Sequence, residues 1–289
     1  MKPDDYRQQW ISLREFAADK GSLEQLSRQI AGSFLRSYRE TGRYERDHID
    51  LLCEMATFSE DPDWNIPACS SLFGVIVEEL CDDYEEIQLE IYARVMSQVI
   101  SCCRHLPQGK QIDQGLRKFG LFSESDLLNR ARIIHSKGYS FNSAKNPKKI
   151  CILSRVTIGA DVAIVSVIIQ RLHRLFPDAE IIIIGSAKMK EIFGANPYVR
   201  IRNVNYTRHG GLLERFSCWF RVLDILSQEN PPAATDSMIV IDPDSRICQL
   251  GMFPLTHSDN YFYFNSHGNT SISGAAMAEL ANGWMTAVF

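Results

Sequence analysis

The first half of the chain shows the hydrophobic spacing of amphipathic helices. From Asp83 onward, apolar residues recur every four positions, at Ile87, Ile91, Val95 and Val99. This is the period of a helix that buries a broad apolar face. Similar spacing predicts further helices over residues 6–19, 23–41, 45–58, 69–80 and 124–136. We therefore expect residues 1–140 to form an all-helical domain.

Residues with strong conformational preferences indicate where these helices begin and end. Ser22 and Ser123 stand where an N-cap side chain would accept a hydrogen bond from the first helical turn. Gly42 stands where glycine is favoured just beyond a helix, because it adopts a positive φ at little cost. Prolines interrupt the helical spacing and predict loops at Pro62, Pro67 and Pro107.

The second half changes from helical spacing to short, continuous apolar runs. Residues 141–149 form a polar stretch with the composition of a linker. Beyond it, apolar runs predict strands over residues 150–153, 180–184, 199–204, 238–241 and 261–264. Helices are predicted over residues 161–176, 187–193, 212–226 and 273–286. Alternating strands and helices are typical of a parallel sheet covered on both faces, so residues 150–289 are expected to form a Rossmann-like α/β domain.

The composition is that of a globular protein, and it narrows the range of partners. Hydrophobic residues make up 45% and charged residues 23% of the 289 positions, which is ordinary for folded domains. The formal net charge is −4, from 31 basic and 35 acidic side chains. The chain therefore lacks the excess of Lys and Arg that binding to a phosphate backbone requires, and we expect no nucleic-acid partner.

Targeting, membrane and metal-binding signals are not found in the sequence. No stretch reaches the roughly 18 apolar residues that a membrane-spanning helix needs. The N-terminal residues MKPDDYRQQW lack the apolar core of a signal peptide, so we expect a cytoplasmic location. None of the eight cysteines forms a CxxC pair, which favours reduced, buried thiols. The Cys and His spacings match no ligand pattern, so no metal site is expected.

The loops that follow the predicted strands hold the candidate chemistry, because ligands of open α/β sheets bind at the carboxyl ends of strands. The first loop, from Ser154 to Asp161, contains neither GxGxxG nor a P-loop. Asp161 has two interpretations: a carboxylate that accepts backbone N–H groups at a helix start, or a general base at the mouth of a cleft. Asp242, Ser245 and Arg246 follow another predicted strand and are candidates for ligand contact.

Residues from about 148 to 289 resemble the start of glycosyltransferase family 9, the heptosyltransferase-like enzymes. The resemblance rests on an apolar strand followed by Arg155 and a loop of small residues. It continues through the run FPDAEI at residues 176–181 and through Asn196-Pro197-Tyr198. The later runs DPDSRICQLGMFPL and YFYFNSHGNTSISGAAMAELANGW are also similar to some members.

Two positions depart from the family pattern. Members usually have a glycine directly before the aspartate, whereas Ala160 separates Gly159 from Asp161 in this chain. His267 stands where related sequences often have Arg.

The resemblance implies one half of a GT-B fold, in which two Rossmann-like domains face a cleft and the first of them binds the acceptor. It also implies inverting, metal-independent transfer of a sugar from a nucleotide-sugar to a glycan such as lipopolysaccharide core. The nucleotide-sugar would be a substrate, so no cofactor is expected. Asp161 would be the general base that takes the proton of the acceptor hydroxyl. The residues expected to contact the acceptor are Arg155, Thr157, Gly159, Asp242, Ser245, Arg246, Ser266 and His267.

These observations lead to one favoured function and to alternatives from other classes. The favoured function is the acceptor-binding half of a glycosyltransferase, inactive by itself, with a glycan or glycolipid acceptor and a separate donor-binding domain or subunit as partners. Such a protein would be cytoplasmic or peripheral at the inner membrane. The main alternative is a non-catalytic interaction or scaffold protein with a relic Rossmann-like domain. An unrelated nucleotide-binding protein is disfavoured by the missing phosphate-binding motifs.

Overall fold

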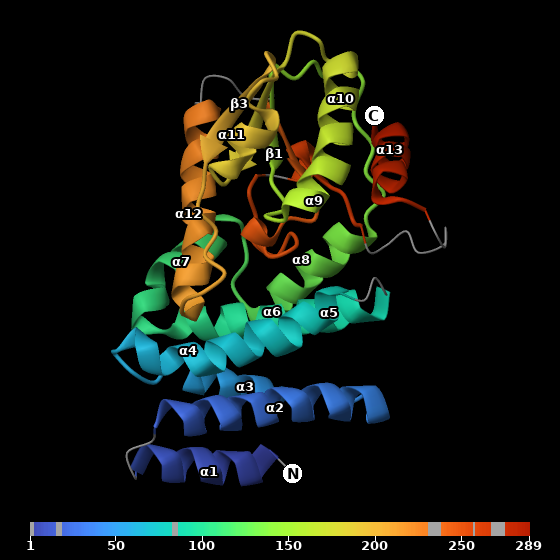
Figure 1. Ribbon diagram of the computed structural model, residues 1–289. Coiled ribbons are helices and arrows are strands. Elements are labelled where there is room, and N and C mark those ends of the chain that lie inside the picture. The colour runs from blue at the N-terminus through green and yellow to red at the C-terminus, as the bar shows by residue number, and fades with distance from the viewer. Residues whose placement is uncertain (1–2, 16–18, 83–85, 231–237, 257, 267–274) are drawn as a thin grey trace. The chain divides into compact units, whose positions relative to one another are not determined.

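Figure 1 shows the computed structural model of the chain, which describes residues 3–15, 19–82, 86–230, 238–256, 258–266 and 275–289. A helical unit comprises residues 1–128 and 207–215, and a Rossmann-like unit comprises residues 129–206 and 216–289. The division falls earlier than the predicted linker at 141–149. Residues before that linker belong with the sheet, because the rings of His135 and Tyr139 pack beside those of Tyr263 and Phe262.

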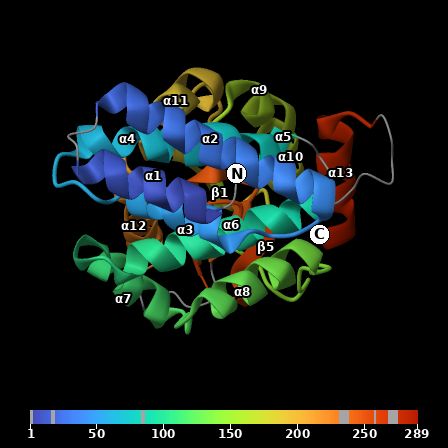
Figure 2. The same cartoon turned by 90° about the horizontal axis from the view of Figure 1, so that it is seen from below.

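The described residues of the helical unit are predominantly helical, as predicted. Its elements are α1 (Pro3–Glu15), α2 (Lys20–Thr41), α3 (Arg46–Met55), α4 (Pro62–Ser71), the π-helix η1 (Leu72–Val77), α5 (Glu78–Asp82), α6 (Glu86–His105), the 3-10 helix η2 (Pro107–Gly109), α7 (Lys110–Lys118) and the start of α8 (Glu124–Ser136). Figures 1 and 2 show α1, α2 and α3 side by side. Trp10, Ile30, Phe34 and Leu52 are fully buried in this unit.

The helix ends confirm some predicted caps and correct one. Gly42 ends α2 with a φ of 69° and donates its N–H to the Tyr38 carbonyl, as a glycine C-cap should. Ser123 accepts the Asp126 N–H at 3.2 Å at the start of α8. Ser22, however, is not the N-cap of α2. Asp19 takes that place, and its carboxylate accepts the Ser22 N–H at 2.9 Å.

Two further predictions in this unit were wrong or incomplete. Pro67 lies inside α4 rather than in a loop. The helix continues past it because Ala68 and Cys69 are buried, and this packing outweighs the hydrogen bond that proline cannot donate. Helix α7 was not predicted, because only Ile112 and Leu116 supply a buried apolar pair in an otherwise mostly polar segment.

Within the described residues, the Rossmann-like unit contains one parallel sheet. Its strands are β1 (Lys149–Leu153), β2 (Glu180–Gly185), β3 (Val199–Asn203), β4 (Met238–Asp242) and β5 (Tyr261–Tyr263). They are ordered β3-β2-β1-β4-β5, and every neighbouring pair is parallel. The predicted α/β class and Rossmann-like sheet are therefore confirmed.

Helices cover both faces of this sheet (Figure 1). The elements are α9 (Ile158–Ala160), the π-helix η3 (Asp161–Val165), α10 (Ser166–Leu175), α11 (Lys188–Phe193), α12 (Leu212–Glu229), the 3-10 helices η5 (Arg246–Cys248) and η6 (Ser258–Asn260), and α13 (Met277–Val288). On one face Ile152 and Ile183 pack with Ile168 of α10 and Met285 of α13. Helix α12 lies on the opposite face.

The described residues also bear on two expectations from the sequence, one about membrane-spanning helices and one about the cysteines. No helix there combines the length and the apolar character needed to cross a membrane. All eight cysteines fall within the described residues, and each is a free thiol.

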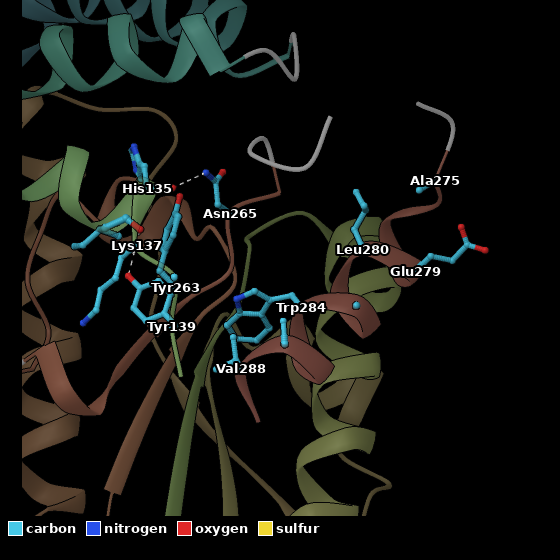
Figure 3. A pocket seen from close by; sticks show the side chains of 14 residues that line it. His135, Lys137, Tyr139, Tyr263, Asn265, Ala275, Glu279, Leu280, Trp284 and Val288 are labelled. Carbon is cyan, nitrogen blue, oxygen red and sulfur yellow. Dashed lines mark hydrogen bonds between the residues drawn. The ribbon is translucent and has the colours of Figure 1, made fainter. Parts of the chain in front are cut away.

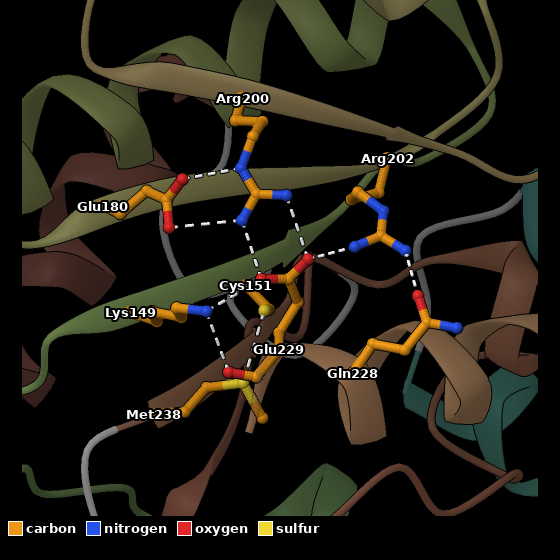
Figure 4. A network of polar contacts seen from close by, with 8 residues as sticks. All are labelled: Lys149, Cys151, Glu180, Arg200, Arg202, Gln228, Glu229 and Met238. Carbon is orange, nitrogen blue, oxygen red and sulfur yellow. Dashed lines mark hydrogen bonds and ion pairs between the residues drawn. The ribbon is translucent and has the colours of Figure 1, made fainter. Parts of the chain in front are cut away.

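A network of charged groups joins the starts of the strands to the end of α12 (Figure 4). Glu229 accepts hydrogen bonds from Arg200 at 2.7 and 2.9 Å, from Lys149 at 2.9 Å, and from Arg202. Arg200 also binds Glu180 at 2.6 Å. The Glu229 side chain is only 5% exposed. Its hydrogen bonds, chiefly those from Arg200, lower its pKa to about 2.

This network predicts a loss of stability in acid. Because the folded pKa of Glu229 lies below its ordinary value, its contribution is complete above about pH 4.5 and is lost as the pH falls towards 2. Glu229→Gln should lower the free energy of unfolding at pH 7 by up to about 3 kcal/mol, measured by urea denaturation. The variant and the wild type should converge near pH 2. Glu191→Gln, on α11, is the control and should change little. Equal stability of Glu229→Gln and wild type at pH 7 would contradict the prediction.

Candidate functional site

The carboxyl ends of β1, β4 and β5 bring most of the predicted site residues to one edge of the sheet. Ser154 and Arg155 follow β1, Asp242 ends β4, and Ser266 lies three residues beyond β5. Because these strands are parallel, their carboxyl ends share an edge, which we call the carboxyl edge. Residues far apart in the sequence therefore meet there through side-chain contacts.

Asp161 lies at the first position of the π-helix η3 and is fully buried, with 0% of its surface exposed. One carboxylate oxygen accepts the Arg155 backbone N–H at 2.7 Å, and the other accepts the Ser154 hydroxyl at 2.9 Å. Burial raises the pKa of Asp161, and these two hydrogen bonds partly oppose that effect. The carboxylate thus fixes the loop after β1 to the helical run that follows it.

Non-glycine residues with a positive φ follow both β1 and β4 closely. Val156 has a φ of 74° and Asp244 a φ of 63°, which places both in the left-handed region. A β-branched residue such as Val156 rarely adopts this conformation, whose cost is of the order of 1–3 kcal/mol. The Val156 N–H donates to the Ser154 hydroxyl at 3.0 Å, which helps to hold the turn. Strain of this kind is concentrated at functional sites in proteins.

Arg155 connects the loop after β1 with the residues after β4 and β5. Its Nη2 donates to Asp244 at 3.1 Å and to the Ser266 hydroxyl at 3.3 Å, and its side chain is 13% exposed. Asp244 also accepts hydrogen bonds from Tyr263 at 2.9 Å and from Ser266. The Asp244 carboxylate is completely buried, so these donors compensate for its lost hydration. They also fix the position of the Arg155 guanidinium.

Asp242 forms a second buried carboxylate site beneath the edge. It accepts hydrogen bonds from the Ser245 N–H at 2.7 Å, the Cys248 thiol at 2.6 Å and the Tyr261 hydroxyl. Burial raises its pKa to about 6, although these hydrogen bonds act in the opposite direction. Ser245 in turn donates its hydroxyl to the Ser154 carbonyl at 2.5 Å. Asp242 and Ser245 therefore hold loops together rather than face solvent.

The remaining predicted site residues differ in their placement. Thr157 is the N-cap residue of α9, but its side chain makes no capping hydrogen bond. Gly159 is exposed, and a Cβ at that position would meet no atom within 4 Å. Arg246 begins the short helix η5 and is partly exposed. His267 lies outside the described residues.

Four residues that complete this edge were not among the site residues expected from the sequence: Asp244, Tyr263, Tyr261 and Cys248. Tyr263 is buried, with 1% of its surface exposed. The sequence shows that Asp242 and Asp244 are two positions apart. It does not show which groups donate hydrogen bonds to each of them. Among the described residues, no group of three or more His, Cys, Asp or Glu side chains is arranged to hold a metal ion.

The contacts of Asp161 predict different outcomes for two substitutions. Asp161→Ala would leave the Arg155 N–H and the Ser154 hydroxyl without their acceptor, at about 1–3 kcal/mol for a buried group. Asp161→Asn can still accept from the Arg155 N–H and place its amide beside Ser154, so it should cost less than about 1 kcal/mol. Urea denaturation at pH 7 measures both. Equal losses for the two variants would contradict this role of the side chain.

The raised pKa of Asp242 predicts a pH dependence of opposite sign to that of Glu229. A carboxyl group whose folded pKa is raised favours the folded state when protonated, so its contribution declines as the pH rises from about 4 to above 6. In Asp242→Asn this decline disappears. The difference in unfolding free energy, wild type minus variant, should therefore fall by about 2 kcal/mol between pH 4 and pH 7. A difference that stays constant over this range would refute the burial argument.

Comparison of the chain with protein-family models, curated proteins and solved structures found no match in any of the three.

Proposed function

We propose that the Rossmann-like unit is the acceptor-binding half of an inverting, metal-independent glycosyltransferase of the heptosyltransferase-like class, with the donor-binding half of a GT-B fold supplied separately. The observation that carries the proposal is Asp161. It begins η3 just after the loop that follows β1, has a raised pKa, and accepts the backbone N–H of Arg155 from that strained loop. The motif FPDAEI and the parallel sheet order support the same proposal.

In the proposed reaction, an acceptor hydroxyl attacks the anomeric carbon of the nucleotide-sugar. A new C–O bond forms, and the bond to the diphosphate breaks, with its electron pair leaving on the diphosphate oxygen. The proton of the acceptor hydroxyl passes to the Asp161 carboxylate. A raised pKa suits this step, because a base near the working pH accepts a proton more readily.

The burial of Asp161 adds a requirement to this mechanism. Both of its oxygens are engaged, and no part of it is exposed. The acceptor can reach it only after the turn at Val156 moves. The strained φ of Val156 favours such a movement, because leaving the left-handed region releases energy. Arg155, anchored through one nitrogen on Asp244, would then contact an anionic group of the acceptor.

One observation favours the second candidate function, a non-catalytic interaction or scaffold protein. The complete burial of Asp161, with a donor at each oxygen, is what a purely structural carboxylate shows. In that protein the edge would be a relic, and the loop after β1 would stay closed.

Binding of phosphorylated lipopolysaccharide-core oligosaccharide to the 289-residue chain tests the proposal. Arg155→Ala should weaken binding about tenfold or more, because it removes charge-assisted hydrogen bonds, and Arg155→Lys should weaken it less. Arg174→Ala, an exposed arginine on α10, is the matched control and should bind like the wild type. Calorimetric titration measures each affinity.

Turnover provides the second measurement. The chain alone should release no nucleoside diphosphate from ADP- or UDP-linked sugars, because the donor wall is absent from the proposed half. In the chain joined to its donor-binding half, Asp161→Asn should lower transfer by about 10²–10⁴-fold. Transfer by the 289-residue chain alone would contradict the half-enzyme proposal. Absence of oligosaccharide binding would favour the scaffold function.

A further inference from the structure

The Rossmann-like unit contains a pocket beside β5, the strand at one edge of the sheet. Its volume is about 530 Å³, within the range of small-molecule sites. Its walls are residues 134–139, the end of β5, and α13, as Figure 3 shows. The residues that line it all belong to the Rossmann-like unit.

Aromatic rings form the opposite walls of this pocket. Figure 3 shows Tyr139 and Tyr263 on one side and the indole of Trp284 on the other. The imidazole of His135 lies 5.3 Å from the ring of Tyr263. Ring faces of this kind interact best with another ring, in offset-stacked or edge-to-face arrangements.

The polar side chains of the lining already use polar atoms in contacts with the protein. These contacts join Tyr139 Oη to the Ile134 carbonyl (3.3 Å), Tyr263 Oη to Asp244 (2.9 Å), His135 Nε2 to the Leu250 carbonyl (2.9 Å) and Asn265 Nδ2 to the His135 carbonyl (3.2 Å). A ligand rich in hydroxyl groups would find few partners among these atoms. Burying unpaired hydroxyls is unfavourable, so these four engaged atoms disfavour a sugar ring placed against them.

The charged side chains of the lining, Lys137 and Glu279, do not project between the aromatic walls in Figure 3. Lys137 stands over the ring of Tyr139, with its nitrogen 5.2 Å from the ring centroid. Glu279 accepts the Ala276 N–H at 3.0 Å and points away from the rings in Figure 3. Among the described lining residues, therefore, the surface between the aromatic walls carries no charged group, and it favours an uncharged ligand.

We propose that this pocket binds an uncharged aromatic compound of one or two fused rings. A rigid ring loses less conformational freedom on binding than an alkyl chain does, and it can use the ring faces of both walls. Tyr263 links the pocket to the carboxyl edge, because its ring lines the pocket while its hydroxyl binds Asp244. The proposal does not depend on glycosyl transfer.

Gly283 offers a way to fill the pocket without disturbing the fold. It lines the pocket from α13, and a Cβ at this position would meet no atom within 4 Å. Leucine is also a better helix former than glycine, so Gly283→Leu should fold at least as well as the wild type. Ala287, one turn further along α13, also lines the pocket, and Ala287→Leu is a second filling variant.

The experiment is calorimetric titration of the full chain with indole. The wild type should bind with a Kd of about 0.1–1 mM, the range for a ligand of this size. Gly283→Leu and Ala287→Leu should each weaken binding about tenfold or more, whereas Gly283→Ala should retain it. Gly32→Leu, a matched change on α2 where a Cβ also meets no atom within 4 Å, should bind like the wild type. Circular dichroism and thermal melting confirm that each variant is folded.

Two further ligands test the chemical class. Decanol, an uncharged alkyl chain, and methyl glucoside, an uncharged sugar, should both bind more weakly than indole. The proposal is overturned if the wild type does not bind indole, if both folded filling variants bind it as tightly as the wild type, or if decanol or methyl glucoside binds more tightly.

Discussion

Buried carboxylates that accept hydrogen bonds from neighbouring loops hold the carboxyl edge of the sheet together. Asp161 joins the loop after β1 to the helical run, and Asp242 joins the end of β4 to β5 through Tyr261. Asp244 receives the guanidinium of Arg155. An ionised carboxylate can only accept hydrogen bonds, so each buried one requires donors around it. The loops supply those donors, and their positions are fixed as a result.

The two ends of the sheet hold carboxylates whose pKa values are shifted in opposite directions. Glu229 receives charged donors, Arg200 and Lys149 among them, and its pKa falls to about 2. Asp242 receives neutral donors from a backbone N–H, a thiol and a phenol, and its pKa rises to about 6. Cations stabilise the ionised form more than neutral donors do, so they outweigh burial at Glu229, whereas burial is the dominant cause at Asp242. The contacts of Glu229 therefore stabilise the fold at neutral pH. Protonation of Asp242, in contrast, stabilises the fold at lower pH.

The proposed reaction uses side chains that also stabilise the fold. Their structural contacts therefore limit when they can take part in the reaction. Asp161 cannot serve as a base while it accepts from Ser154 and Arg155, so the reaction requires the strained turn at Val156 to move. The aromatic pocket is a different kind of site, because several of its polar atoms are engaged and the rings of Tyr139 and Trp284 remain partly exposed. Tyr263 belongs to both, with its ring in the pocket and its hydroxyl on Asp244.

The sequence by itself determined the α/β class and the parallel strands, because apolar periodicity is a local property. It also located Gly42, where a positive φ leaves little choice of residue. It did not find α7, whose apolar content is low. Only the tertiary structure decided that Asp161 is buried and that Tyr263 meets Asp244. The contacts of Tyr263 with Asp244 and of Arg155 with Ser266 depend on strand order and side-chain packing, which bring together residues about 20 to 110 positions apart and leave no periodic signal in the sequence.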